Sequence, residues 1–321
     1  MKRSRLGLFI LVGFIVLVLV GPLIIPFPDL EGIEPLGNLI YPESKFINIE
    51  GIDFHYREIQ NNEPLILLLH GFGSSTYSWE KVMVPLSQNG TVVAYDRPAF
   101  GLTERINYDR NLSQNPYAFD FQVSMVKNMM DSLKKEKAIL IGNSAGGTIA
   151  MAAALKYPDR IKAIILVDSA VKNGNGAPAW IQPVLNTPQM DILGPLLVRS
   201  IRERGLEILK LAWYDPTKIT DDDLLNYQKP LKISDWDKAL WEYTKANRDN
   251  GIENNISKIK IPVLIVSGTE DKLIPKEQSI WLANEIENSK LVLIPECGHV
   301  PQEECPEAFL SVVSTFLSEL Q

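Results

Sequence analysis

The sequence contains little cysteine and little histidine. Its 321 residues include two cysteines, Cys297 and Cys305, and three histidines. Two cysteines eight positions apart are neither a disulfide framework nor a CxxC metal motif, so we expect free thiols, with one local disulfide as the alternative. The sequence also lacks an H-E-x-x-H motif, a Cys/His cluster and a Walker-type loop, so no cofactor is implied.

An excess of positive charge is absent as well. The formal net charge is −7, although Lys2, Arg3 and Arg5 lie at the beginning and no acidic residue precedes Asp29. An acidic body repels phosphate backbones, so nucleic acid is not expected as a partner. With 45% hydrophobic and 22% charged residues, the composition is that of a globular protein with enough apolar material for a large core.

One long uncharged run lies near the beginning, from Leu6 to Ile25. At about 1.5 Å per residue, a helix over this run would just span the hydrocarbon core of a membrane. No small-residue cleavage site ends the run, so an uncleaved anchor is favoured over a cleaved signal peptide. The basic residues before it predict, by the positive-inside rule, a single-pass membrane protein with an extracytoplasmic body; secretion after signal cleavage is the alternative.

Eight short β-rich runs follow the first connector, and the last six are continuous apolar runs, which are typical of strands buried on both faces of a parallel sheet. The runs are 46–49, 54–58, 65–69, 92–95, 139–141, 164–167, 263–266 and 291–294. Stretches with helical spacing separate them, at 79–86, 119–133, 145–156, 280–286 and 308–320. This order predicts an α/β fold with a mostly parallel, doubly wound sheet of about eight strands, of which the first two are antiparallel.

About ninety residues separate the strands at 164–167 and 263–266, more than a loop requires. Two pieces with helical spacing, 196–211 and 235–246, and four tryptophans lie there: Trp180, Trp213, Trp236 and Trp241. We expect a helical cap over the carboxyl edge of the sheet, with tryptophans that line an apolar pocket or pack the cap onto the core. The expected domains are an anchor (1–28), a core in two parts (29–169 and 261–321) and the cap (170–260).

A glycine-rich turn follows the strand at 139–141. Its sequence is Gly142-Asn143-Ser144-Ala145-Gly146-Gly147, and a helix follows. G-x-S-x-G between a strand and a helix predicts a serine on a sharp, strained turn with an exposed hydroxyl. Glycine is needed on either side because a side chain there would collide with neighbouring backbone.

From about Lys45 to the C-terminus, the chain resembles the α/β-hydrolase superfamily. His70-Gly71-Phe72-Gly73 looks like the oxyanion turn of that family, and the resemblance implies an oxyanion hole made by the backbone N–H groups of Phe72 and Ala145. Asp96-Arg97-Pro98-Ala99-Phe100-Gly101 is similar to the family's D-R-P-G-x-G turn except at Ala99, which implies a structural role for Asp96. Relatives that open epoxides or remove halides carry Asp where this chain carries Ser144, so acyl transfer to water is favoured.

A serine hydroxyl needs a base to become a good nucleophile, and histidine serves as such a base near neutral pH. His55 lies in an early strand, and His70 belongs to the oxyanion turn. His299 follows the last strand, as the catalytic histidine of the family does. We therefore predict that His299 is the base.

The acid that orients this histidine is expected at Asp271. Gly268-Thr269-Glu270-Asp271 resembles the family's G-x-x-D turn, and the chain order Ser, Asp, His agrees with it. Asp168 is the main rival, because some members carry the acid after the preceding strand. Glu270 is a weaker rival.

Together these residues predict a membrane-anchored serine hydrolase that cleaves a carboxylic ester through an acyl-enzyme intermediate. Ser144 attacks the acyl carbon, His299 transfers the proton and Asp271 orients His299. Aminopeptidase, thioesterase, lactonase and carbon–carbon bond hydrolase use the same triad, and an acyltransferase or a non-catalytic binding protein are further alternatives. The expected partner is a small molecule with an apolar acyl group; neither its identity nor the oligomeric state is indicated.

Overall fold

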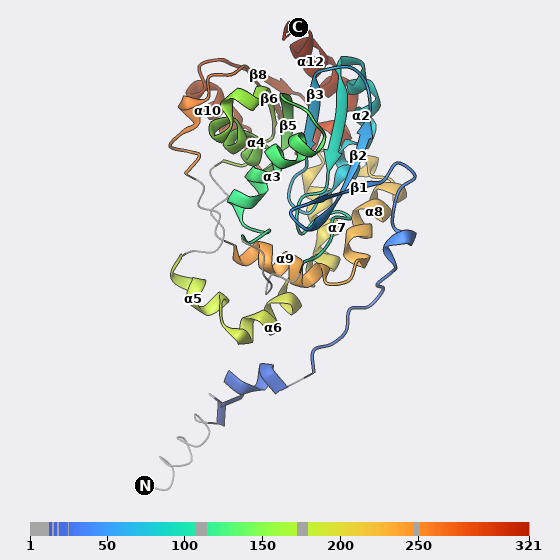
Figure 1. Ribbon diagram of the computed structural model, residues 1–321, viewed down its shortest axis with the longest axis vertical. Coiled ribbons are helices and arrows are strands. Elements are labelled where there is room, and N and C mark those ends of the chain that lie inside the picture. Colours follow the sequence, from blue (N-terminus) through green and yellow to red (C-terminus); the bar gives the residue numbers. More distant parts are fainter. Residues whose placement is uncertain are drawn as a thin grey trace.

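The computed structural model describes residues 13–14, 16–17, 19–24, 26–106, 114–171, 179–246 and 251–320. An eight-stranded sheet with the order β1-β2-β4-β3-β5-β6-β7-β8 forms the centre of the molecule (Figure 1). The strands are β1 (Lys45–Ile49), β2 (Ile52–Ile59), β3 (Leu65–Leu69), β4 (Thr91–Tyr95), β5 (Ala138–Asn143), β6 (Ile161–Val167), β7 (Val263–Gly268) and β8 (Ser289–Ile294). β2 pairs antiparallel with β1 and β4, and all other neighbours are parallel. The predicted mostly parallel sheet is confirmed.

Helices cover both faces of the sheet. One buried cluster joins the sheet to α3 (Phe119–Ser132), α4 (Ala145–Lys156) and α10 (Lys276–Glu285), and another joins the opposite face to α2 (Glu80–Leu86) and α12 (Pro306–Glu319). The central strand β3 shows why its sequence is apolar throughout: alternate residues enter alternate clusters, and all five are 0% exposed. A strand covered on both faces has no polar side, as expected.

Between β6 and β7, the described part of the chain forms five α-helices at one end of the sheet (Figure 1). We call them the inserted helices: α5 (Gln182–Leu185), α6 (Pro188–Val198), α7 (Ile201–Ala212), α8 (Asp221–Gln228) and α9 (Trp236–Lys245).

The prediction of a single helix over 196–211 is wrong, because α6 ends and α7 begins within this range. Two contacts hold α6 against α9: a Cβ on Gly194 would lie 2.0 Å from the Trp241 ring, and Arg199 bonds to Asp237 at 2.8 Å. Because α6 packs along α9, the chain turns before α7 begins. The domain boundaries proposed from the sequence stay predictions.

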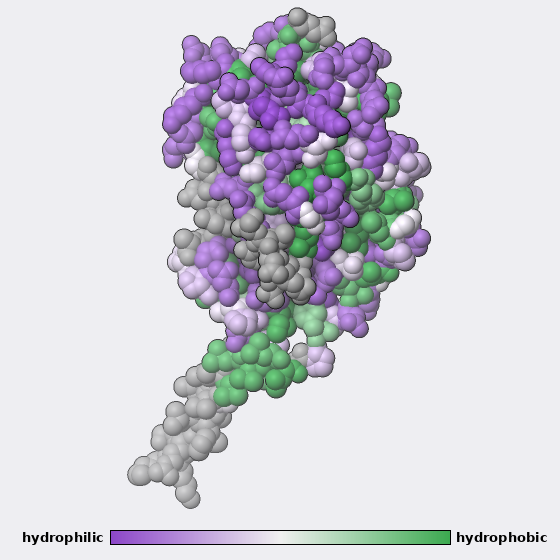
Figure 2. Space-filling model, viewed as in Figure 1, coloured by the Kyte–Doolittle hydropathy of each residue, from purple (hydrophilic) through white to green (hydrophobic). Residues whose placement is uncertain are grey.

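The N-terminal segment carries exposed apolar side chains, including Phe14, Leu23 and Ile24, and it extends from the body (Figure 2). Over the residues that the structure describes, no helix is both long and apolar enough to cross a membrane. Residues 6–12, 15, 18 and 25 of the predicted anchor lie outside the described residues. The described helical part ends at Ile24, and the Leu19 carbonyl accepts a hydrogen bond from Gln189 of α6 at 2.7 Å. The prediction of a membrane anchor, and with it of a single-pass protein with an extracytoplasmic body, is therefore corrected.

Candidate active site

Ser144 lies in the sharp turn between β5 and α4. Its backbone adopts φ 52° and ψ −119°, a strained conformation for a residue with a side chain. Glycine is required nearby, because a Cβ on Gly146 would lie 2.0 Å from the Leu69 carbonyl oxygen and a Cβ on Gly142 would lie 2.5 Å from the Gly146 oxygen. The turn therefore places Ser144 at the beginning of α4, at the carboxyl edge of the sheet, where open α/β folds bind ligands.

A cavity of about 250 Å³ opens beside Ser144, and His299 forms part of the same wall. Apolar side chains make up much of the remaining wall, among them Phe72, Phe100, Leu206, Leu209, Trp236 and Leu240. Two cationic side chains, Arg105 and Arg202, also line it. Such a cavity suits a small molecule with an apolar part.

The four tryptophans of the inserted segment have different surroundings. Trp236 is 2% exposed and lines the cavity, so it is a pocket residue. Trp213 and Trp241 are also buried, and the contact between Trp241 and Gly194 described above identifies Trp241 as a packing residue. Trp180, in contrast, is 78% exposed. Both roles that the sequence allowed for these tryptophans therefore occur.

His299 and Asp271 come together from two loops that follow neighbouring strands, β8 and β7. His299 Nδ1 lies 2.7 Å from Asp271 Oδ2, and the other carboxylate oxygen accepts the N–H groups of Leu273 at 2.7 Å and Ile274 at 2.9 Å. Because Nδ1 donates to the carboxylate, the other ring nitrogen, Nε2, is the one that can accept a proton. Glu270, the weaker rival for this position, is exposed.

The backbone of His299 is held on both sides. Its N–H donates to the Ala212 carbonyl of α7 at 2.6 Å, and its carbonyl accepts the Asn143 side-chain amide at 2.9 Å. Asn143 immediately precedes Ser144, so one side chain ties the histidine loop to the serine turn. These contacts connect the histidine loop to β5 and to the inserted helices.

A disulfide between Cys297 and Cys305 closes the histidine loop, so the expected free thiols are wrong. The short helix α11 (Pro301–Glu304) turns the chain back between the two cysteines, whose Cα atoms lie 6.3 Å apart. Glu304 lies close to both sulfur atoms, but the disulfide removes the thiolates that a metal ion would need at this group.

The two expected oxyanion donors, the N–H groups of Phe72 and Ala145, belong to segments that meet at Gly71. A Cβ on Gly71 would lie 3.2 Å from the Ser144 Cβ atom, so the oxyanion turn lies directly against the serine turn. Ala145 is the first residue of α4, and its N–H therefore has no acceptor within the helix. Phe72 lines the cavity. Their role in stabilising an oxyanion stays a prediction.

Arg97 holds the oxyanion turn, a role that the sequence analysis did not assign. Its guanidinium donates to the carbonyl groups of His70 and Gly71, both at 3.0 Å, and to the Gln122 side chain at 2.6 Å. His70 Nδ1 donates to the Gly71 carbonyl, and its Nε2 accepts the Arg97 N–H. Burial, together with the charge of Arg97, lowers the pKa of His70 to about 3, so the ring is neutral. The signal in the sequence was the arginine of the D-R-P turn.

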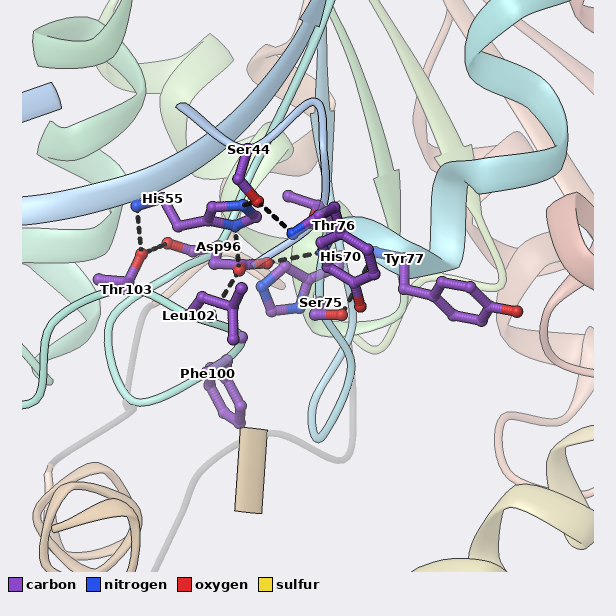
Figure 3. A network of polar contacts seen from close by, with 12 residues as sticks. Ser44, His55, His70, Ser75, Thr76, Tyr77, Asp96, Phe100, Leu102 and Thr103 are labelled. Atoms are coloured by element: carbon purple, nitrogen blue, oxygen red, sulfur yellow. Dashed lines mark hydrogen bonds and ion pairs between the residues drawn. The ribbon is translucent and has the colours of Figure 1, made fainter. Parts of the chain in front are cut away.

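A second serine–histidine–aspartate arrangement lies between β2 and the turn after β4 (Figure 3). Ser44 Oγ donates to His55 Nε2 at 2.7 Å, and His55 Nδ1 bonds to Asp96 Oδ2 at 2.6 Å. Asp96 also accepts the N–H groups of Thr76 and Leu102, both at 2.6 Å. Burial by itself would raise the pKa of Asp96, but the charge and hydrogen bond of His55 outweigh it and lower the pKa to about 2. We call Ser44, His55 and Asp96 the structural relay.

Comparison with known proteins identifies the family. Residues 64–306 match the family described as alpha/beta hydrolase fold. The chain belongs to this family. It is 25% identical over 271 residues to the uncharacterized hydrolase YugF of Bacillus subtilis, covering 84% of this chain and 96% of YugF.

Other relatives of this α/β hydrolase have named substrates. The chain is 27% identical over 291 residues to a 2-hydroxy-6-oxononadienedioate/2-hydroxy-6-oxononatrienedioate hydrolase of Paraburkholderia phymatum, covering 86% of this chain and 96% of that protein. Its fold is similar to that of the meta-cleavage product hydrolase CumD from Pseudomonas fluorescens, with a TM-score of 0.66, 26% identity and coverage of 86% and 98% of the two chains.

Proposed function

We propose that this α/β hydrolase is a serine esterase for small carboxylic esters with an apolar part. The observation that carries the proposal is that Ser144 and His299 share the wall of one largely apolar cavity, while His299 Nδ1 bonds to Asp271 at 2.7 Å. In the proposed reaction, Ser144 Oγ attacks the ester carbon as its proton passes to His299 Nε2. The negative oxygen of the intermediate accepts the N–H groups of Phe72 and Ala145.

The second half of the reaction reverses the proton transfer. His299 gives its proton to the leaving alcohol, and the acyl group stays on Ser144 as an ester. A water molecule then attacks this ester and gives a proton to His299, and the carboxylic acid leaves as the proton returns to Ser144 Oγ. Asp271 remains ionised throughout and keeps Nδ1 protonated.

Two measurements on the purified chain test the proposal. A fluorophosphonate probe should label Ser144, and the Ser144→Ala variant should not be labelled. p-Nitrophenyl esters of increasing acyl length should be hydrolysed, with a preference for an acyl chain that fills the cavity. A wild-type protein that is neither labelled nor active on any ester would contradict the proposal.

A carbon–carbon bond hydrolase is the second candidate. It is supported by the relatives named for dienedioate substrates and by Arg105 and Arg202 in the cavity wall, because guanidinium groups bind carboxylates well. Turnover of a 2-hydroxy-6-oxo-dienoate should then exceed ester hydrolysis, and Arg202→Ala should raise KM for the dienoate without raising KM for a neutral ester. Equal effects on both substrates would contradict this candidate.

A further inference from the structure

A second buried carboxyl group, Asp168, lies behind Asp271, and the proposed mechanism does not use it. Asp168 directly follows β6, and its side chain is 0% exposed. Asp271 is the neighbouring charged group with the largest effect on Asp168, and the side chain of Asp271 is also 0% exposed. Two ionised carboxylates that lie close together and away from water would repel each other strongly, which favours a neutral acid at one of them.

The hydrogen bonds around Asp271 favour its ionised form. One oxygen accepts His299 Nδ1, and the other accepts two backbone N–H groups, from Leu273 and Ile274. Three donors aimed at one carboxyl group stabilise the carboxylate and not the acid. Asp271 is therefore the ionised member of the pair.

The surroundings of Asp168 favour the neutral acid. Its Oδ1 accepts the Ser267 hydroxyl at 2.6 Å and the Gly268 N–H at 3.2 Å, whereas Oδ2 has only a longer contact with the same N–H, at 3.4 Å. Oδ2 is thus the oxygen that can carry the proton. Complete burial, followed by the charge of Asp271, raises the pKa of Asp168 well above its ordinary range.

We propose that Asp168 is a positioning residue: a neutral carboxylic acid whose O–H donates to the Asp271 carboxylate. This inference rests on the proposed function of Ser144, His299 and Asp271. The hydrogen bond holds Asp271 in the orientation that faces His299 Nδ1. It also makes Asp271 a weaker base, so that the proton taken from Ser144 stays on His299 and does not pass on to Asp271. The proton of Asp168 itself remains in place throughout the reaction.

Two variants and their pH profiles test whether Asp168 donates to Asp271, because a loss of packing alone would not shift the pH profile. In Asp168→Asn, the amide NH₂ can donate to Asp271 while the amide oxygen accepts from Ser267 and Gly268. Asn also tolerates the φ of 43° at this position. Asp168→Gly tolerates the same φ but removes the donor. For each variant, kcat and KM for an ester are measured from about pH 5 to pH 9.

We expect the Asn variant to keep kcat within about threefold of wild type, with an unchanged pH profile. The Gly variant should lose roughly ten- to a hundredfold in kcat with little change in KM, because Asp271 is no longer held in place. Its kcat/KM should rise at higher pH than in wild type, because a more basic Asp271 stabilises protonated His299. The titratable groups that face Asp168 are Asp271 and, behind it, His299.

Two kinetic results would overturn the inference. In the first, kcat of the Asn variant falls a hundredfold, or its kcat/KM rises at a lower pH than in wild type. Either outcome would mean that Asp168 is ionised in the wild-type protein. If the Gly variant kept the wild-type rate and profile, no positioning by Asp168 would exist.

An infrared difference spectrum between wild type and Asp168→Asn at neutral pH decides the protonation state even if the Gly variant does not fold. A carboxylic-acid C=O band that is lost in the variant supports the inference, and the absence of such a band overturns it. This readout does not depend on catalysis. Failure of the fluorophosphonate to label wild-type Ser144 would instead refute the proposed function, so the two failures are distinguishable.

Discussion

Among the residues that the structure describes, two serine–histidine–aspartate arrangements can be compared, and they differ in what surrounds the serine. In the structural relay, Ser44 Oγ donates to His55 and also accepts the Tyr41 N–H at 2.9 Å, so both its proton and a lone pair are engaged. The three residues of this relay do not belong to the wall of the cavity beside Ser144. The relay is therefore suited to fixing the fold.

Ser144 has different surroundings. It lies on a strained turn at the beginning of α4 and shares a cavity of about 250 Å³ with His299. The comparison teaches that contacts among a serine, a histidine and an aspartate do not by themselves make a hydrolase site. Room for the substrate and N–H donors for the oxyanion are needed as well.

The largest expected difference between the two arrangements concerns their serines. Ser144→Ala removes the proposed nucleophile and should lower kcat by about 10⁴- to 10⁶-fold. Ser44→Ala should keep kcat within about threefold, because Ser44 touches no substrate in the proposed mechanism. Ester hydrolysis by the purified variants, with circular dichroism as the control for folding, measures both. Comparable losses in the two variants would contradict the distinction.

The two aspartates should differ in the property that they affect. Asp271→Asn should lower kcat by about 10⁴-fold, because an amide favours the wrong tautomer of His299. Asp96→Asn breaks a buried pair with His55 and should lower the free energy of unfolding by about 3 to 5 kcal/mol. Its effect on kcat of the folded enzyme should be less than about tenfold. Urea unfolding and kcat are measured for both variants. An exchange of the two effects would refute the assignment of Asp271 to catalysis and of Asp96 to stability.

Acid should destabilise the oxyanion turn through His70. The folded protein keeps His70 neutral, with a pKa of about 3, whereas the unfolded chain binds a proton near the ordinary pKa of 6.5. The free energy of unfolding should therefore be fully retained above about pH 6.5 and decrease by roughly 4 kcal/mol as the pH falls toward 3. Urea unfolding at a series of pH values measures how the free energy of unfolding changes with pH.

His70→Gln is the matched control for this pH dependence of the free energy of unfolding. The amide oxygen of the glutamine can still accept the Arg97 N–H, but the amide does not titrate. The same pH dependence in this variant as in wild type would show that other groups cause the acid sensitivity.

Asp96 acts in the same direction at lower pH. Its pKa of about 2 lies below the ordinary 3.8, so the stabilisation that ionised Asp96 gives to the fold is lost as the pH falls through that interval.

The smallest expected effect is that of Ser44→Ala on stability. The variant loses the hydrogen bond to His55, and the free energy of unfolding should fall by about 1 kcal/mol. Ser44→Thr, which keeps the hydroxyl, is the control and should lose less. An unchanged stability of the alanine variant would show that the link between Ser44 and His55 does not contribute to the fold.

The strands were predictable because their cause is local. Each parallel strand is an unbroken apolar run, and the run itself reports burial on both faces. The ends of the strands were less well predicted: β6 begins at Ile161, three residues before the expected position, because pairing with β5 extends the strand beyond its apolar part. The uncharged N-terminal run shows the limit of the same reasoning, since hydropathy alone indicated an anchor that the described structure does not contain.

The candidate site was predictable where a motif carries its own geometry. The serine turn requires glycines at defined positions, and the sequence by itself therefore determined where Ser144 lies, between β5 and α4. The residues Asp271 and His299 were proposed from the turns after two strands, and neighbouring strands of a parallel sheet bring such turns together.

Contacts between distant segments were decided only by the tertiary structure. The pairing of His55 with Asp96 joins residues that lie far apart in the chain, and so does the effect of the Asp271 charge on Asp168. No short pattern encodes them, because a buried polar group takes whichever partner the packed elements bring within hydrogen-bond distance. The sequence by itself determined the order of the elements and the serine turn, whereas the packing of the sheet, the helices and the loops decided which charges are paired, buried or kept neutral.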